Sequence, residues 1–170
     1  PRSTLSSSSA ASDVYKRQPM YSRKIVPPDF IVPEKIEKSE FTLKPLTVRD
    51  IIKDYDAVMS SVDHLKGLMD DSGWPEGLTI EENLIDLGWH QREFTEKHSF
   101  AYTILSPSNH ECIGCCYIYP SENKEFEVQA FYWIRQNMLS DGLEDRFGNF
   151  FKEWIKNDWP FKSAEFPGRD

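Results

Sequence analysis

An aromatic stripe near the C-terminal end is the feature that most constrains the fold. Apolar side chains recur there at helical spacing, and most of them carry rings. A helix with such a face must pack on another layer of structure to bury it. We therefore predict a helix here that packs as core against a sheet, rather than one that uses its rings to hold a ligand. The stripe consists of Phe147, Phe150, Phe151, Trp154 and Ile155.

Patterns upstream of the stripe predict a sheet and two further helices. Residues 41–46 alternate apolar and polar side chains, as a half-buried first strand does. Thr47 with Asp50, and Thr79 with Glu82, form two capping-box patterns, which predict a helix start at each place. The other expected elements are a loop at 66–78, the end of the second helix near 98, a hairpin of strands at 100–105 and 113–119, a third strand at 126–134, and a closing strand at 163–166.

The first 18 residues do not resemble native protein. Residues 8–18 are one permitted translation of a transposase-based sequencing adapter, and residues 1–4 fit the flow-cell end of the same adapter. We interpret residues 1–18 as an artefactual, disordered leader and exclude them from arguments about targeting. A serine-rich native leader or transit peptide is the alternative that the composition allows.

The remaining chain divides into an arm and one domain. Residues 19–40 combine prolines with mixed charges, and we expect an extended arm that is packed by Phe30 and Ile31. Residues 41–170 have the usual size of one domain with a single core. The sequence leaves open whether this domain is naturally short or truncated at its C-terminus.

Charge and hydropathy exclude two classes of partner. The net charge is −8, and it becomes −10 without residues 1–18, which carry three basic and one acidic side chain. This acidic balance argues against binding to the phosphates of nucleic acid. No apolar run approaches the roughly 20 residues that cross a bilayer. We expect a cytoplasmic monomer or homodimer that binds neither nucleic acid nor membranes.

The cysteines fall within one predicted strand, at positions 112, 115 and 116. Alternation along a strand predicts Cys112 and Cys116 on one face and Cys115 on the other. Only two thiolates would then converge, whereas structural zinc takes four ligands. We therefore expect buried core cysteines and neither a metal site nor a disulfide framework.

Two local motifs add to the order of the predicted elements. Ile113-Gly114 lies in a strand that ends at Pro120, and the run Tyr132-Trp133-Ile134-Arg135 precedes a helix. Together with the element order, these motifs resemble the GNAT superfamily of N-acetyltransferases over residues 41–170. The resemblance implies an α+β fold, with a mixed, mostly antiparallel central sheet flanked by helices on both faces. It also implies acetyl transfer from acetyl-CoA to an amine of a small molecule or a peptide.

The resemblance further implies where the chemistry would lie. In the family the amine attacks directly, and a carboxylate near the fourth strand relays its proton through water. Glu127 occupies the matching place and is the candidate base, while Tyr132 is a candidate acid by residue type. An exposed strand-edge glutamate and a packing tyrosine are the alternatives for these two residues.

The cofactor motif of the family is only partly present. Members carry Gln/Arg-x-x-Gly-x-Gly/Ala, whose backbone N–H groups grip the cofactor's pyrophosphate at a helix start. Here the matching residues 139–144 read Leu-Ser-Asp-Gly-Leu-Glu, so the central glycine alone survives. The cofactor-binding residues that the resemblance implies are Trp133, Ile134, Arg135, Ser140, Gly142 and Leu143.

Acidic side chains at this helix start leave two functions open. Asp141, Glu144 and Asp145 stabilise the helix dipole, but the same charges would repel a diphosphate. One hypothesis is an acetyltransferase with an unconventional grip on its cofactor. The other is a catalytically degenerate GNAT-like fold that acts as a small-ligand or protein-binding module.

Overall fold

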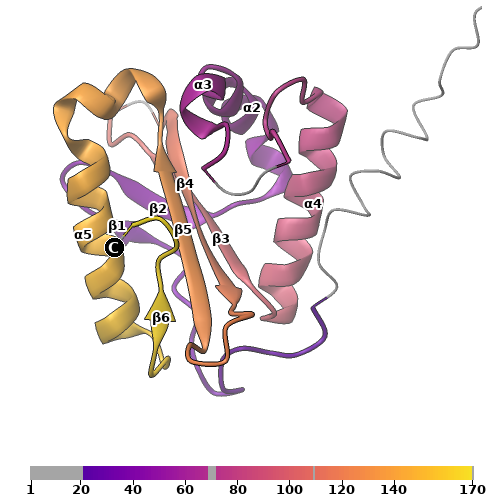
Figure 1. Ribbon diagram of the computed structural model, residues 1–170, viewed down its shortest axis with the longest axis vertical. Coiled ribbons are helices and arrows are strands. Elements are labelled where there is room, and N and C mark those ends of the chain that lie inside the picture. The colour runs from indigo at the N-terminus through magenta and orange to yellow at the C-terminus, as the bar shows by residue number, and fades with distance from the viewer. Residues whose placement is uncertain (1–20, 69–71, 109, 170) are drawn as a thin grey trace, which may run out of the picture.

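A six-stranded sheet forms the centre of the computed structural model, which describes residues 21–68, 72–108 and 110–169 (Figure 1). The strands follow one another across the sheet in chain order, and all neighbours are antiparallel except β5 and β6, which are parallel. The strands are β1 (Ile36–Glu37), β2 (Thr42–Pro45), β3 (Phe100–Leu105), β4 (Cys112–Pro120), β5 (Val128–Ile134) and β6 (Ala164–Glu165). The expected α+β fold with a mixed, mostly antiparallel sheet is confirmed.

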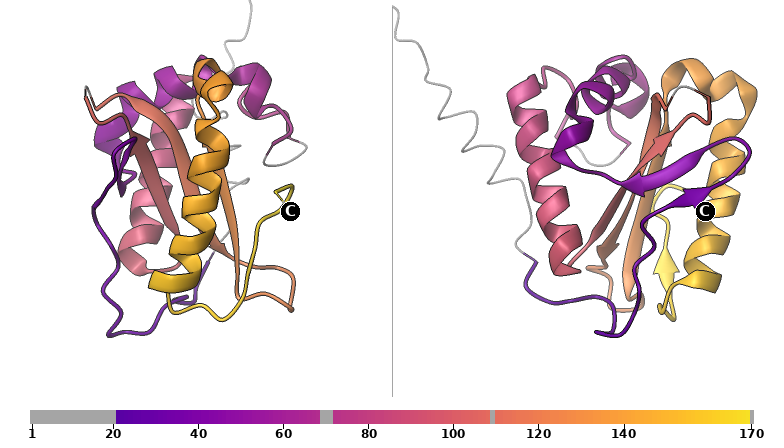
Figure 2. Two further views of the ribbon diagram at one scale, coloured as in Figure 1. Left: turned by 90° about the vertical axis from the view of Figure 1, so that its left-hand side faces the viewer. Right: turned by 180° about the vertical axis from the view of Figure 1, so that it is seen from behind.

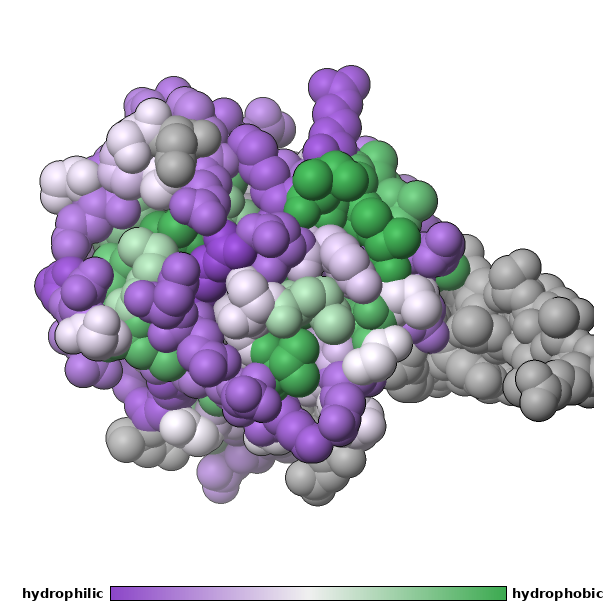
Figure 3. All heavy atoms as spheres, turned by 90° about the horizontal axis from the view of Figure 1, so that it is seen from above, coloured by the Kyte–Doolittle hydropathy of each residue, from purple (hydrophilic) through white to green (hydrophobic). Residues whose placement is uncertain are grey.

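Helices cover both faces of this sheet, with α5 on one face and α2 and α4 on the other (Figures 1 and 2). The α-helices are α2 (Ile51–Met59), α3 (Val62–Leu65), α4 (Ile80–Glu96) and α5 (Leu143–Asp158), with 3-10 helices η1 (Val48–Asp50) and η2 (Gln136–Asp141) before α2 and α5. No helix among the described residues is long and apolar enough to cross a membrane. On the face seen from above, apolar side chains reach the surface in patches that hydrophilic side chains separate (Figure 3).

Both predicted helix starts are present. The backbone N–H of Thr47 donates to the Asp50 carboxylate at 2.8 Å, and the chain then enters α2 through the short helix η1. At the second start, the Glu82 N–H donates to the Thr79 hydroxyl at 3.2 Å, and the Thr79 N–H donates to the Glu82 carboxylate at 2.9 Å. These reciprocal bonds satisfy N–H groups that a helix start would otherwise leave without partners.

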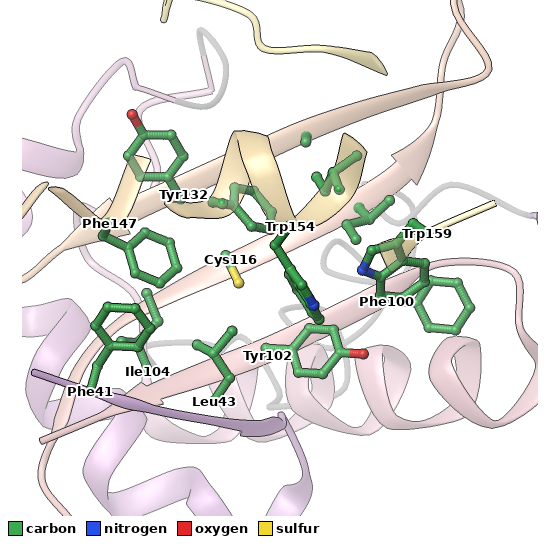
Figure 4. Packing of buried hydrophobic residues seen from close by; sticks show 14 of the residues in the cluster. Phe41, Leu43, Phe100, Tyr102, Ile104, Cys116, Tyr132, Phe147, Trp154 and Trp159 are labelled. Carbon is green, nitrogen blue, oxygen red and sulfur yellow. The ribbon is translucent and has the colours of Figure 1, made fainter. Parts of the chain in front are cut away.

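The aromatic stripe of α5 is buried against the sheet, as its spacing predicts. Phe147 and Phe151 are fully buried, and Trp154 meets Tyr102 of β3 edge to face at 5.4 Å (Figure 4). Phe150 lies at the rim and packs on Phe41. The rings therefore act as core, and α5 is fixed on the sheet with its first turn beside the end of β5.

A bulge in β4 corrects the predicted orientation of the cysteines. Leu105 pairs with Cys112, but the preceding residue, Ile104, pairs with Gly114, so one extra residue is inserted between these pairs. An extra residue reverses the alternation of faces beyond it. Cys112 therefore lies on the α2 side with Cys115, and the prediction that it shares a face with Cys116 was wrong. The prediction that all the cysteines are buried and unpaired is confirmed.

Gly114 follows this bulge at a point where β5 passes very close. A Cβ atom at this position would lie 2.1 Å from the carbonyl oxygen of Trp133. Only glycine therefore allows the two strands to keep this spacing next to the bulge.

The N-terminal arm contacts the domain through one of its two expected anchors. Phe30 packs on Trp159 with ring centroids 5.4 Å apart, but Ile31 is 87% exposed, so its expected packing was wrong. Neighbouring side chains of an extended segment point in opposite directions, which explains the difference. The interpretation of residues 1–18 lies outside the described residues.

Candidate functional site

The edge of β5 is open over most of its length. β6 pairs with it only at Val128 and Gln129, near the start of β5 (Figure 1). Beyond these residues the outer edge of β5 has no neighbouring strand in the described part of the chain. An uncovered edge presents backbone N–H and C=O groups that another extended group can bind.

An ion pair between Glu144 and Arg169, hereafter the Glu144–Arg169 pair, lies on this edge. Arg169 donates to the two carboxylate oxygens of Glu144 at 3.0 and 3.1 Å. Arg169 also donates to the backbone carbonyl of Tyr132 at 3.2 Å, and the Ile134 N–H donates to Glu144 at 3.4 Å. The pair thus satisfies backbone groups where a ligand would meet the strand.

Surrounding groups stabilise the ionised form of Glu144. His64 of α3 lies 3.0 Å from its carboxylate, and the Arg169 guanidinium lies over the Tyr132 ring at 4.5 Å from the centroid. Burial alone would raise the pKa of Glu144, but the hydrogen bonds and charges of Arg169 and His64 outweigh it and lower the pKa. The carboxylate is therefore balanced by the Arg169 guanidinium and is not an isolated negative charge.

The start of α5 contains a second arginine that also offsets acidic groups. Arg146 donates to the backbone carbonyl of Asp141 at 2.6 Å and pairs with Glu40 at 2.7 Å. Gly142 precedes α5 with φ +68°, a left-handed conformation that favours glycine. Arg169 thus offsets the charge of Glu144, which weakens the predicted repulsion of a diphosphate there, whereas Arg146 is itself paired with Glu40.

The structure gathers some of the predicted site residues around the Glu144–Arg169 pair. Tyr132 and Ile134 contribute backbone groups to it, and Gly142 and Leu143 form the start of the helix that carries Glu144. Ser140 is exposed in η2, just before that start.

Three predicted residues lie elsewhere. Trp133 faces the α2 side, where its indole N–H donates to Tyr117 at 3.2 Å. Arg135 is buried and pairs with Asp56 and Glu111, which joins α2 to the start of β4. Glu127 is exposed at the beginning of β5, far along the strand from Ile134, and accepts a hydrogen bond from the Lys162 N–H at 2.9 Å.

Sequence reasoning missed two partners of this site. His64 is 80 residues from Glu144 in the chain, and Arg169 is 25 residues away. No local spacing links groups so far apart, so only the fold could reveal them.

A second feature is a pocket of about 500 Å³ on the opposite, α2 and α4 side of the sheet, hereafter the aromatic pocket. β5 contributes Gln129 and Phe131 to it, so this one strand borders both the pocket and the Glu144–Arg169 pair. The polar and aromatic side chains that line it are Tyr21, Asp54, Ser72, Trp74, Asn83, Asp86, Trp89, His90, Tyr117, Tyr119, Glu122, Gln129 and Phe131.

Rings contact one another around this pocket. The ring centroids of Tyr21, Trp89 and Tyr119 are 5.9, 6.3 and 6.4 Å apart in pairs. Tyr117 stacks on Tyr119 at 5.8 Å, and the His90 ring lies 5.3 Å from Tyr117. Such mutual contacts hold large side chains in fixed positions and give the pocket a preformed wall.

The deep wall of the pocket contains a hydrogen-bonded cluster. Asp54 accepts from Asn83 at 2.8 Å and lies 3.3 Å from the Cys115 sulfur. Burial raises the pKa of Asp54, although both hydrogen bonds act against the increase. The bulge in β4 also brings the ligand atoms of Asp54, Cys112 and Cys115 within 4.8 Å of one another. Three donors are one short of a structural zinc set.

No known family model and no curated protein matches this chain. Solved acetyltransferase structures are similar to it in fold. A ribosomal-protein alanine acetyltransferase from Vibrio fischeri matches with a TM-score of 0.58 and 15% identity over 71% of this chain and 66% of that one. This chain therefore spans just under two thirds of that protein.

Two further neighbours were solved with a cofactor. RimL, a ribosomal-protein α-N acetyltransferase in complex with coenzyme A, matches with a TM-score of 0.57 and 16% identity over 74% of this chain and 71% of its own. The microcin C7 self-immunity acetyltransferase MccE, in complex with acetyl-CoA and AMP, matches with a TM-score of 0.55 and 13% identity. The match covers 75% of this chain and 71% of MccE. At these identities the likeness concerns the fold alone, and this chain shares its fold with these solved acetyltransferases.

Proposed function

We propose that this protein is an N-acetyltransferase that takes acetyl-CoA as donor and an amine as acceptor. The observation that carries the proposal is the open edge of β5 beside the start of α5, with a pocket on the other side of the same strand. Two of the fold neighbours contain coenzyme A or acetyl-CoA, which supports a ligand of this type.

Residues on the β5 edge fit the donor. The Ile134 N–H and the Tyr132 carbonyl now bind side chains, and an extended chain with amide groups can bind both instead. Arg169, once released from Glu144, offers a guanidinium that suits phosphate oxygens. When bound, acetyl-CoA supplies an acetyl thioester, whose C–S bond breaks as the C–N bond to the amine forms.

The acceptor amine is assigned to the aromatic pocket, because Gln129 and Phe131 reach it from the strand whose edge receives the donor. Glu127 and Tyr132 remain the proposed proton-transfer groups. The backbone carbonyl of Tyr132 lies at the open edge, but its ring packs on Phe147 and Phe151 of α5, and Glu127 precedes the strand, so neither side chain lines the aromatic pocket. The side chains of Trp133 and Arg135 are buried away from this edge. They would affect a bound cofactor only through the residues that they contact, which are Tyr117 for Trp133 and Glu111 for Arg135.

A binding module without catalysis is the second candidate. It is favoured by one observation: Glu144 and Arg169 satisfy each other and the strand edge, so these groups do not require a cofactor. In that case the aromatic pocket alone would carry the function.

Calorimetric titration with acetyl-CoA distinguishes the two candidates. The proposal predicts saturable binding to the wild type and tighter binding to Glu144→Gln, because the neutral amide leaves Arg169 free for the phosphates. The advantage of the variant should shrink at higher salt, since screening acts over roughly 10 Å at 0.1 M. Glu153→Gln, an exposed carboxylate further along α5, is the matched control and should bind as the wild type does. Absence of binding in all three proteins would favour the binding module.

A further inference from the structure

The side chains that line the aromatic pocket carry charge of one sign. Asp54, Asp86 and Glu122 contribute carboxyl groups, and the described lining residues include no lysine or arginine. A second pocket, next to the N-terminal arm, differs in this respect because Arg23 and Lys24 line it. The aromatic pocket therefore offers a negative environment, which attracts positively charged ligands.

The carboxylates act on the rings of the same pocket. Burial raises the pKa of Tyr21 to about 12, and the charge of Glu122 contributes to the increase. Burial likewise raises the pKa of Tyr119, with smaller contributions from Tyr21 and Asp86. Acidic groups and aromatic faces thus lie close enough together to act on one ligand.

Three mutually contacting rings suit an organic cation. The faces of tryptophan and tyrosine attract ammonium groups through the negative charge density of the ring. Tyr21, Trp89 and Tyr119 supply such rings, with centroids 5.9 to 6.4 Å apart. The volume of about 500 Å³ is within the range of small-molecule sites.

A buried polar atom in the pocket wall has no partner. The Nδ1 atom of His90 is inaccessible to solvent and makes no hydrogen bond with any described residue. Burial lowers the pKa of His90 to about 4, so the ring is neutral near pH 7. The wall therefore adds no positive charge at His90 that would repel a cation.

We propose that the aromatic pocket recognises a protonated primary amine on a flat apolar body, such as an arylalkylammonium ion. The mutually contacting rings of Tyr21, Trp89 and Tyr119 form the wall on which the ligand packs, and Glu122 balances its charge. The assignment of this cation as the acetyl acceptor rests on the proposed function, whereas its binding rests on the pocket alone.

Three matched probes test the charge preference. Phenethylammonium, 2-phenylethanol and phenylacetate share one ring and differ in charge, and each is titrated calorimetrically against the full chain without any acetyl donor. We expect the cation to bind about tenfold or more tightly than the alcohol, and the anion to bind most weakly. Equal binding of the cation and the alcohol, or no binding of the cation, would overturn the proposal.

Variants test the residues that are named. Glu122→Gln should weaken binding of the cation severalfold and leave binding of the alcohol unchanged, because it removes a negative charge from the pocket lining. Glu122 is exposed, so the change should not disturb the fold. Trp89→Leu should weaken binding of both probes. Glu81→Gln, an α4 carboxylate outside the pocket, should leave both unchanged. An effect of Glu81→Gln equal to that of Glu122→Gln would mean that only the general surface charge matters, which contradicts the proposal.

His90→Phe is a packing control. It keeps an aromatic ring in the wall and removes a nitrogen that is closed off from the pocket, so we expect unchanged binding of both probes. Weaker binding of the cation alone would contradict the assignment of charge recognition to Glu122. The two proposals also fail separately: cation binding without acetyl transfer overturns only the acceptor assignment, while acetyl transfer without cation binding overturns the inference about this pocket.

Discussion

Arg169 donates two hydrogen bonds to the carboxylate of Glu144, at 3.0 and 3.1 Å, across the open edge of β5. This bidentate contact joins the segment after β6 to the first turn of α5. It also replaces the strand neighbour that β5 lacks, because the same two side chains bind the Tyr132 carbonyl and the Ile134 N–H. The proposed donor must displace this pair, so the pair links the stability of the fold to the function.

The contribution of Glu144 to stability should depend on pH. Its pKa is lowered from 4.5 in the folded state, so the stabilisation is fully present above pH 4.5 and is lost as the pH falls through the lower folded value. The difference in free energy of unfolding between the wild type and Glu144→Gln should therefore shrink below pH 4.5. Urea unfolding at a series of pH values measures it, with Glu153→Gln as control for other acidic groups. A difference that stays constant with pH would contradict the observed ion pair.

Trp154→Ala should destabilise the protein by about 3 to 5 kcal/mol, the usual cost of deleting a large core aromatic. Trp154 is 4% exposed and contacts Tyr102 and Trp159, so the truncation leaves a cavity between α5 and the sheet. Ile52→Ala is the control, because Ile52 is 68% exposed and its loss should cost about 0.5 kcal/mol or less. Similar unfolding midpoints for both variants would show that the stripe is not core.

Gly148→Ala should destabilise the protein by about 1 to 3 kcal/mol, as overpacking of a core does. A Cβ atom at position 148 would lie 2.1 Å from the Tyr132 hydroxyl oxygen, and that ring is held by Phe147 and Phe151. Gly88→Ala in α4 is the matched control: its nearest neighbour would be 3.8 Å away, so alanine should stabilise that helix by about 0.5 to 1 kcal/mol. Denaturant unfolding of both variants should give opposite signs, and equal signs would contradict the packing described for Tyr132.

Deletion of residues 1–18 should leave the melting temperature unchanged. Our interpretation of this segment as a translated adapter gives it no selected role in the core. Differential scanning calorimetry of the full and shortened chains measures this directly. A loss of several degrees in the shortened chain would show that the segment belongs to the native protein.

The fold could be predicted from the sequence where the signals are local. The Thr47 and Thr79 capping boxes and the α5 stripe lie within a few residues of the features they specify, and each is confirmed. The bulge in β4 could not be predicted in this way. It depends on how Ile104 and Leu105 pair with the neighbouring strand, and a single extra residue was enough to turn Cys112 to the other face.

The site was less predictable, because contacts between distant segments create it. Counting the carboxylates of the α5 start suggested repulsion of a diphosphate, but Arg169 and His64 reach Glu144 from elsewhere in the chain and change that balance. The aromatic pocket likewise combines residues of the arm, α4 and β4, such as Tyr21, Trp89 and Tyr119. Each ring taken singly fits ordinary packing, so no pattern in the sequence singles them out.

Acetyl transfer itself is the most direct test of the account. The measurement is release of coenzyme A thiol from acetyl-CoA in the presence of phenethylammonium, with mass spectrometry to identify the N-acetyl product. We predict thiol release that requires both the protein and the amine, and that decreases in Trp89→Leu because the acceptor pocket loses part of its wall. Thiol release that is independent of the amine, or no release from a protein that binds both ligands, would contradict the claim that this chain is an N-acetyltransferase.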